Sequence, residues 1–161
     1  MSLAVVTGHC YRNYWGQIGD NTPLAEEAVA LFGVRDLYPE AERERLERSA
    51  IDVVRWRDGR AERNVSEALD RLSERVEEIY LHVDFDGFAP EVAPGIVDEP
   101  APGGLTREQA EEIIRGAAAR FRVRAVTLAT YTPDNDEDEK TLRLALALVD
   151  LIGELIAGAS D

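Results

Sequence analysis

The feature that most constrains this chain is a short hydrophobic segment, residues 80–85, that runs directly into a loop rich in glycine and proline. Its composition is typical of a buried β-strand. Side chains alternate between the two faces of a strand, so His82, Asp84 and Asp86 are predicted to project the same way. Two carboxylates this close repel each other unless a cation or a positively charged substrate group lies between them. The segment therefore predicts a cation-binding site at the end of a strand.

Segments typical of strands and helices alternate along the chain. Strands are expected at 28–34, 51–54, 80–85 and 123–129, and helices at 40–49, 64–79, 106–120 and 139–156. This order predicts an α/β fold, a partial doubly wound and mainly parallel sheet of about four strands with helices on both faces, in three layers. Sites in such sheets form beyond the carboxyl ends of the strands, so Thr130 is expected to converge with Asp84 and Asp86 on one pocket.

Two helices carry more detailed signals. Thr106 and Gln109 have the spacing of a capping box at a helix start. The closing helix is expected to bury an apolar stripe made of Leu142, Leu146, Val149 and Ile152.

Size and charge narrow the class of protein. The 161 residues have the length of a single domain, residues 1–161. A formal net charge of −14 argues against binding to nucleic acid or to an anionic membrane surface. No segment has the apolar length of a membrane span and no signal peptide is evident, so a cytoplasmic protein is expected. Cys10 is the single cysteine, which excludes a disulfide framework and a cysteine-rich zinc site.

The motif around Asp84 resembles that of the arginase, agmatinase and formiminoglutamase family of metal-dependent ureohydrolases. The resemblance is carried by Asp84, Asp86 and Pro90, by Pro94-Gly95 and Gly103-Gly104-Leu105-Thr106, by Phe32-Gly33-Val34-Arg35-Asp36 upstream, and by Tyr131-Thr132-Pro133 and Asp136 downstream. It implies that Asp84 and Asp86 bind a binuclear Mn²⁺ centre, whose metals generate hydroxide from a shared water at neutral pH. The hydroxide would attack the carbon of a linear C–N bond in a small guanidino or amidino substrate. The resemblance also implies a trimer or hexamer.

Other ligand segments of that family are missing from the printed sequence. The resemblance implies a G-G-D-H segment and a D-x-H-x-D segment on the N-terminal side, and neither occurs here. Met1-Ser2-Leu3-Ala4 resembles a helix that normally follows them, so the chain is interpreted as the C-terminal portion of a ureohydrolase. We therefore expect an incomplete metal site and negligible activity of the isolated chain. A complementing N-terminal half or a homo-oligomer is the expected partner.

Two pocket positions differ from those of guanidine-cleaving relatives. By the resemblance, Thr130 stands where these relatives have a glutamate that pairs with the guanidinium, and Tyr38 where arginases hold the substrate amino group with an aspartate. A neutral hydroxyl cannot replace the charge-assisted hydrogen bond of a carboxylate. Arginine and agmatine are therefore doubtful substrates. His82 is a weaker pocket candidate, with packing as its expected role.

Two alternative interpretations stay open. The segment from Val83 to Gly87 also resembles the first motif of haloacid-dehalogenase-type phosphatases, in which Mg²⁺ lies between two catalytic aspartates. Its mid-chain position, and Phe88 where those enzymes have threonine, argue against that function. Otherwise the chain is a non-catalytic interaction subunit or a fragment, because half of a doubly wound sheet exposes an apolar edge that needs a partner.

Overall fold

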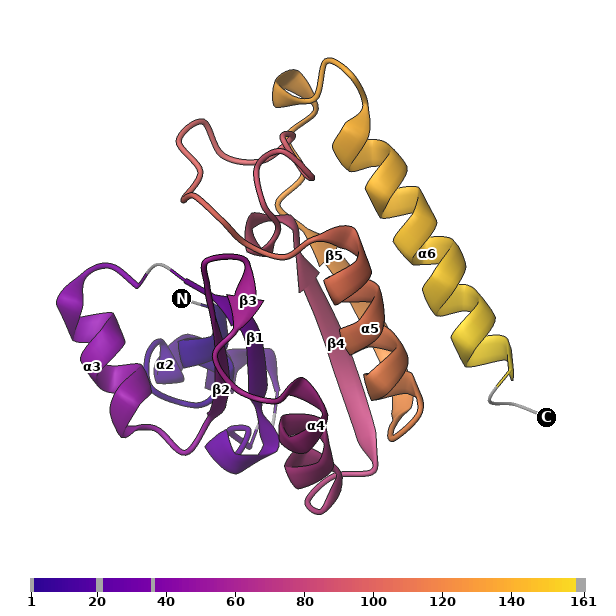
Figure 1. The fold of residues 1–161 in the computed structure, drawn as a ribbon. Helices are drawn as coiled ribbons and strands as arrows, with labels where there is room; N and C mark the ends of the chain where they lie inside the picture. Colours follow the sequence, from indigo (N-terminus) through magenta and orange to yellow (C-terminus); the bar gives the residue numbers. More distant parts are fainter. Residues whose placement is uncertain (1, 20–21, 36, 159–161) are drawn as a thin grey trace.

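The computed structural model describes residues 2–19, 22–35 and 37–158, in which helices pack on two β-ladders (Figure 1). The helices are α1 (Ser2–Val6), α2 (Arg12–Ile18), α3 (Glu40–Arg48), α4 (Val65–Ser73), α5 (Arg107–Ala118) and α6 (Lys140–Gly158). The strands are β1 (Ala30–Val34), β2 (Asp52–Arg57), β3 (Arg60–Ala61), β4 (Glu78–Asp84) and β5 (Arg122–Ala129). Met1 and Asp36, which belong to motifs named above, lie outside the described residues. No helix in the described ranges is long and apolar enough to cross a membrane.

The strands form two hydrogen-bonded ladders. One has the order β1-β2-β3, in which β1 and β2 are parallel and the short β3 is antiparallel to β2. The other pairs β4 with β5 in parallel. The predicted α/β class with mainly parallel strands is confirmed. The four predicted strands do not join into one ladder, however, because β1 and β4 are not hydrogen-bonded to each other within the described residues.

The main core lies between the β4-β5 ladder and the pair of helices α5 and α6 (Figure 1). Its most deeply buried large side chains are Val54, Phe85, Phe88, Ile96 and Leu148. A second, smaller cluster joins α4, α5 and the residues just after α5, through Leu69, Ala117 and Phe121. Three of these five side chains, Phe85, Phe88 and Ile96, belong to the irregular segment between β4 and α5.

The predicted apolar stripe of α6 is confirmed at Ile152, is half-buried at Leu142 and is wrong at its other two positions. The buried residues of α6 are Thr141, Leu144, Leu148, Leu151 and Ile152, whereas the predicted Leu146 and Val149 are exposed. Apolar residues surround most of this helix, so sequence periodicity leaves its rotation undetermined. The packing against α5 selects the buried face.

Helix boundaries differ from the predictions at two places. The helix expected over 64–79 ends at Ser73, and β4 begins at Glu78 after a short turn. The helix α2 was not predicted, because no residue of it is buried and its sequence has no apolar periodicity. The capping box of α5 is confirmed, with Thr106 and Gln109 each accepting a hydrogen bond from the other's backbone N–H.

Candidate functional site

The two predicted ligands lie where β4 ends. Asp84 is the last residue of β4 and is exposed, and Asp86 lies in the 3-10 turn Phe85–Gly87. The side chain of Phe85, between them, is 1% exposed and anchors the turn in the core. The Asp84 carboxylate accepts a hydrogen bond from the backbone N–H of Asp86 at 3.0 Å. The turn therefore holds two carboxylates close together at the carboxyl end of a parallel strand, the usual place for a site in this class of fold.

Arg35 fixes the backbone of this turn from the neighbouring ladder. It follows β1, and its guanidinium donates hydrogen bonds to the carbonyl oxygens of Asp86 at 2.7 Å and Phe88 at 3.3 Å. It also donates to the carbonyl oxygen of Ala101 at 3.1 Å. One side chain thus joins the end of β1 to both ends of the loop after β4. The sequence had indicated Arg35 as part of a motif but not this role.

The Gly-Gly-Leu-Thr segment pairs with the same turn. The backbone N–H of Leu105 donates to the carbonyl oxygen of Gly87, and the carbonyl oxygen of Leu105 accepts from the N–H of Ala89, both at 3.0 Å. A Cβ atom on Gly104 would lie 2.5 Å from the carbonyl carbon of Phe88, and Gly104 has a φ of 122°. This position therefore requires glycine. These two backbone hydrogen bonds of Leu105 explain the spacing of the motif, because they bring the Gly-Gly-Leu-Thr segment back to the turn that holds the carboxylates.

The Pro94-Gly95 pair contacts the start of α6. The N–H of Gly95 donates to the Thr141 hydroxyl at 2.7 Å, and its carbonyl oxygen accepts from the N–H of Thr132 at 2.8 Å. The buried Asp136 carboxylate accepts from the N–H groups of Thr141 at 3.0 Å and Leu142 at 2.9 Å. Burial alone would raise the pKa of Asp136, but these hydrogen bonds outweigh it and the pKa is lowered. The downstream motif residues therefore cap α6 and hold the loop.

Thr130 follows the last residue pair of the β4-β5 ladder. Asp84 pairs with Ala129 across the ladder, so Thr130 is the next residue beyond that pair. Its φ of 64° is in the left-handed region, which costs a β-branched residue about 1–2 kcal/mol. Strain of this kind is typical of functional sites. The expected convergence of Thr130 with Asp84 is consistent with this register.

The two weaker pocket candidates are exposed. His82 is on the same strand as Asp84, two residues earlier, and its ring lies edge-on to that of Tyr80 with centroids 6.2 Å apart. The side chain of Tyr38 is 88% exposed. Roles for both in substrate binding stay predictions.

The donor set fits a divalent metal by type but is short in number. Carboxylate oxygens suit Mn²⁺, which prefers six-coordinate oxygen-rich sites. Across residues 2–19, 22–35 and 37–158, no three His, Cys, Asp or Glu side chains come together as a group that could hold a metal ion. A metal ion held by Asp84 and Asp86 would therefore need further ligands.

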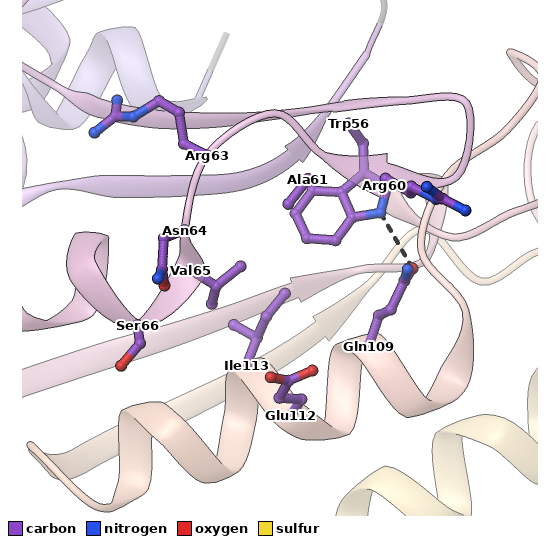
Figure 2. Close-up of a pocket in the computed structure, with 10 residues that line it drawn as sticks. All are labelled: Trp56, Arg60, Ala61, Arg63, Asn64, Val65, Ser66, Gln109, Glu112 and Ile113. Atoms are coloured by element: carbon purple, nitrogen blue, oxygen red, sulfur yellow. Dashed lines mark hydrogen bonds between the residues drawn. The ribbon is translucent and has the colours of Figure 1, made fainter.

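A hollow of about 260 Å³ lies elsewhere, between the β2-β3 hairpin and the starts of α4 and α5 (Figure 2). Trp56 donates its indole N–H to the side-chain oxygen of Gln109 at 3.1 Å, and the amide of Gln109 donates to the carbonyl oxygen of Gly59 at 2.8 Å. Gln109 thus joins the capping box of α5 to the hairpin. Neither Asp84 nor Asp86 lines this hollow, so it is separate from the candidate site.

Comparison with known proteins places this geometry in a family. The model of the arginase family matches residues 11–153. The arginase of Bacillus caldovelox is 32% identical over 144 residues, which are 86% of this chain and 47% of that protein. The formimidoylglutamase of Paraburkholderia xenovorans is 29% identical over 123 residues, 74% of this chain and 38% of that protein.

Solved structures of arginases are similar to this chain in fold. The structure of the Bacillus caldovelox arginase superposes with a TM-score of 0.73 at 29% identity, covering 88% of this chain and 47% of that one. That of the Bacillus cereus arginase gives a TM-score of 0.82 at 24% identity, covering 94% and 53%, and supports the fold. The chain spans about half the length of the curated arginases it matches.

Proposed function

Since the chain belongs to the arginase family, we propose that it supplies part of the active site of an Mn²⁺-dependent hydrolase that cleaves a linear C–N bond in a small guanidino or amidino molecule. The observation that carries this proposal is the pair Asp84 and Asp86 at the carboxyl end of β4. The comparisons offer no support for the phosphatase alternative.

The residues of this chain have distinct roles in the proposal. Asp84 and Asp86 would hold the metal, and bound Mn²⁺ would supply activation of a water molecule at neutral pH. Arg35 holds the backbone of Asp86 in place, and the buried Phe85 fixes the turn between the two carboxylates. A site set on a rigid backbone needs less reorganisation when ligand binds.

The substrate pocket is proposed to differ from that of an arginase. Thr130, next to the pair formed by Asp84 and Ala129, presents a neutral hydroxyl. A guanidinium or free ammonium group would find no carboxylate at this position to neutralise it. We therefore expect the complete enzyme to prefer a substrate with less positive charge than arginine or agmatine.

The proposal is tested by metal binding. Purified chain is titrated with Mn²⁺ by calorimetry, and its thermal unfolding is followed with and without Mn²⁺. We expect the chain to bind Mn²⁺ weakly and the variant Asp84→Asn with Asp86→Asn to bind at least about tenfold more weakly. Asp150→Asn removes an exposed carboxylate from α6 and serves as the matched control. Less than one Mn²⁺ per chain, with no thermal stabilisation, would refute a retained metal site.

The isolated chain is expected to be inactive. Two carboxylates cannot hold a binuclear centre in the geometry that catalysis requires. Turnover of arginine, agmatine or formiminoglutamate above a metal-free control would contradict this expectation. A non-catalytic interaction subunit is the second candidate function, favoured by Tyr80 of β4, whose side chain is 58% exposed. Absence of both Mn²⁺ binding and activity would favour it.

A further inference from the structure

The hollow beside the β2-β3 hairpin has the features of a second binding site (Figure 2). Its walls are the hairpin, the start of α4 and the start of α5, and β2 has a strand neighbour on both sides, β1 and β3. The hollow is thus formed by described parts of this chain alone. Its volume of about 260 Å³ lies just below the roughly 300–1,000 Å³ of pockets that hold drug-sized ligands. A ligand here would therefore be small, of the size of a single amino acid.

Side-chain hydrogen bonds join the walls of the hollow to one another. Gln109 of α5 accepts from the indole N–H of Trp56 and donates to the carbonyl oxygen of Gly59 in the hairpin (Figure 2). Arg120, just after α5, donates to the Ser66 hydroxyl of α4 at 2.7 Å. A hollow whose walls are held in this way needs little reorganisation when a ligand binds.

The floor of the hollow is apolar. Trp56 and Ile113 are 6% and 9% exposed and belong to the main core. Ala61 and Val65, which are half-buried, pack against the same core. An apolar group placed in the hollow would therefore be removed from water on contact with these side chains.

Two charged side chains around this floor are free to bind a ligand. The other polar side chains that line the hollow already have partners in the chain, and they are Arg63, Asn64, Ser66 and Gln109. The side chains of Arg60 and Glu112 have neither a hydrogen bond nor an ion pair within the described residues. They come from opposite walls, Arg60 from the hairpin and Glu112 from α5. A ligand in the hollow thus meets one free positive and one free negative charge.

The free charge of Arg60 is unusual for its surroundings. The arginines of the hairpin region that pair with an acidic side chain are Arg55, Arg57 and Arg63. Arg60 has no such pair within the described residues, and it lies directly opposite Arg57 in the β2-β3 ladder. Like charges in this position destabilise a ladder. A carboxylate bound to Arg60 would offset this repulsion, and the planar guanidinium group is suited to bind both carboxylate oxygens.

We infer that the hollow binds a small zwitterion, an α-amino acid with an apolar side chain. Arg60 binds the carboxylate, Glu112 binds the ammonium group, and the apolar side chain lies on the floor beside Trp56. A simple carboxylic acid would be attracted by Arg60 but repelled by Glu112, and a simple amine the reverse. Neither Asp84 nor Asp86 lines the hollow, so this inference does not rest on the proposed function.

The test follows ligand binding through Trp56. The chain contains two tryptophans, so Trp15→Phe leaves Trp56 as the single fluorescent indole. This variant is titrated with L-valine, L-leucine and L-phenylalanine, and calorimetry on the unmodified chain measures the same affinities. We expect saturable binding of at least one of these amino acids at millimolar concentrations, with a change in Trp56 emission.

The best of these ligands is then compared with two analogues. Its amide lacks the carboxylate, and the corresponding carboxylic acid lacks the amino group. Each analogue loses one charge-assisted contact and is expected to bind at least about tenfold more weakly than the amino acid.

Two substitutions assign each charge to one residue. Arg60→Gln should weaken binding of the amino acid at least about tenfold and leave that of the amide unchanged. Glu112→Gln should weaken the amino acid similarly without weakening the carboxylic acid. The matched controls are Arg48→Gln on α3 and Glu111→Gln on α5, neither of which lines the hollow, and both should bind as the unmodified chain does.

Each remaining outcome would overturn the inference. Absence of saturable binding by all three amino acids would do so. Equal binding of the amide would indicate a site for cations only, and equal binding of the carboxylic acid a site for anions only. Binding that Arg60→Gln and Glu112→Gln leave as strong as their controls do would place the ligand elsewhere on the chain.

Discussion

The irregular loop after β4 is more deeply buried than the regular strands β1 and β4, which is the opposite of what is expected. Residues 87–105 contain four prolines and four glycines and have little regular structure. Yet Phe88, Ala93 and Ile96 within this loop are almost completely buried. In the regular strand β4, Tyr80 is largely exposed, and in β1 only Gly33 is classed as buried. In this chain the irregular loop is therefore better packed than the regular strands.

The difference lies in where each region finds its partners. Backbone groups of the loop are bound within the chain, by Arg35 just after β1, by Leu105 and by Thr141 at the start of α6. The strands β1 and β4, by contrast, each have one hydrogen-bonded strand neighbour in the described residues, β2 and β5 respectively. The family motif thus marks a self-contained scaffold for two carboxylates. The β4-β5 ladder beneath this scaffold is less covered, since Tyr80 and His82 on β4 are exposed.

The substitution expected to destabilise the packed loop most is Gly104→Ala. The new Cβ would overlap backbone atoms of Phe88, and the φ of 122° disfavours any side chain. We expect a loss of about 3 kcal/mol in the free energy of unfolding, measured with urea. Gly103→Ala, where the new Cβ meets nothing within 4 Å, is the control and should lose about 1 kcal/mol through its φ of 74°. Equal losses would show that the loop tolerates the overlap.

Removal of the Arg35 side chain tests the link between the two ladders. Arg35→Ala leaves the carbonyl oxygens of Asp86, Phe88 and Ala101 without this donor. We expect a loss of about 2 kcal/mol in unfolding free energy and faster proteolysis within residues 86–101. Arg35→Lys should recover part of both. The control Arg48→Ala breaks an exposed helical ion pair with Glu44 and should cost less than about 0.5 kcal/mol. A loop that stays protease-resistant without Arg35 would contradict the assigned role.

The cap of α6 should show a defined pH dependence. Hydrogen bonds lower the pKa of Asp136 in the folded chain, so the ionised carboxylate contributes stability above its ordinary pKa of 3.8. That contribution is lost as the pH falls below 3.8 toward the lower folded-state pKa. Asp136→Asn, which offers one acceptor to two N–H donors, should cost about 1–2 kcal/mol at pH 7. Urea unfolding at decreasing pH should show the difference shrinking, and a difference that grows instead would refute the assignment.

The fold class was predictable because its signals are local. The capping box of Thr106 and Gln109 and the alternation of strands with helices need no tertiary information, and both are confirmed. The buried face of α6 was not predictable, since Leu146 and Leu148 are equally apolar and only packing distinguishes them. The role of Arg35 also depends on contacts more than fifty residues away in sequence.

The position of the two carboxylates followed from strand alternation, but the state of their strand did not. An apolar run such as residues 80–85 predicts burial whatever lies on either side of it. The run alone does not say whether a neighbouring strand comes from the same chain, because that depends on the assembly. The apolar run therefore predicts a buried strand, whereas in the described residues β4 is hydrogen-bonded to β5 alone and Tyr80 is exposed.

The substitution with the smallest expected effect tests most specifically whether the face of β4 is less covered than the loop. Tyr80→Thr retains a residue suited to strands and removes an aromatic ring that is 58% exposed. If the face of β4 that carries Tyr80 is uncovered in the isolated chain, the free energy of unfolding should change by less than about 0.5 kcal/mol. The buried Phe88→Leu serves as the comparison from the loop and should cost more than about 1 kcal/mol, because it leaves a cavity in the core. A loss above about 2 kcal/mol for Tyr80→Thr would mean that the face is already covered in solution. Dependence of that loss on protein concentration would identify a second copy as the cover, because dissociation precedes unfolding in such a dimer.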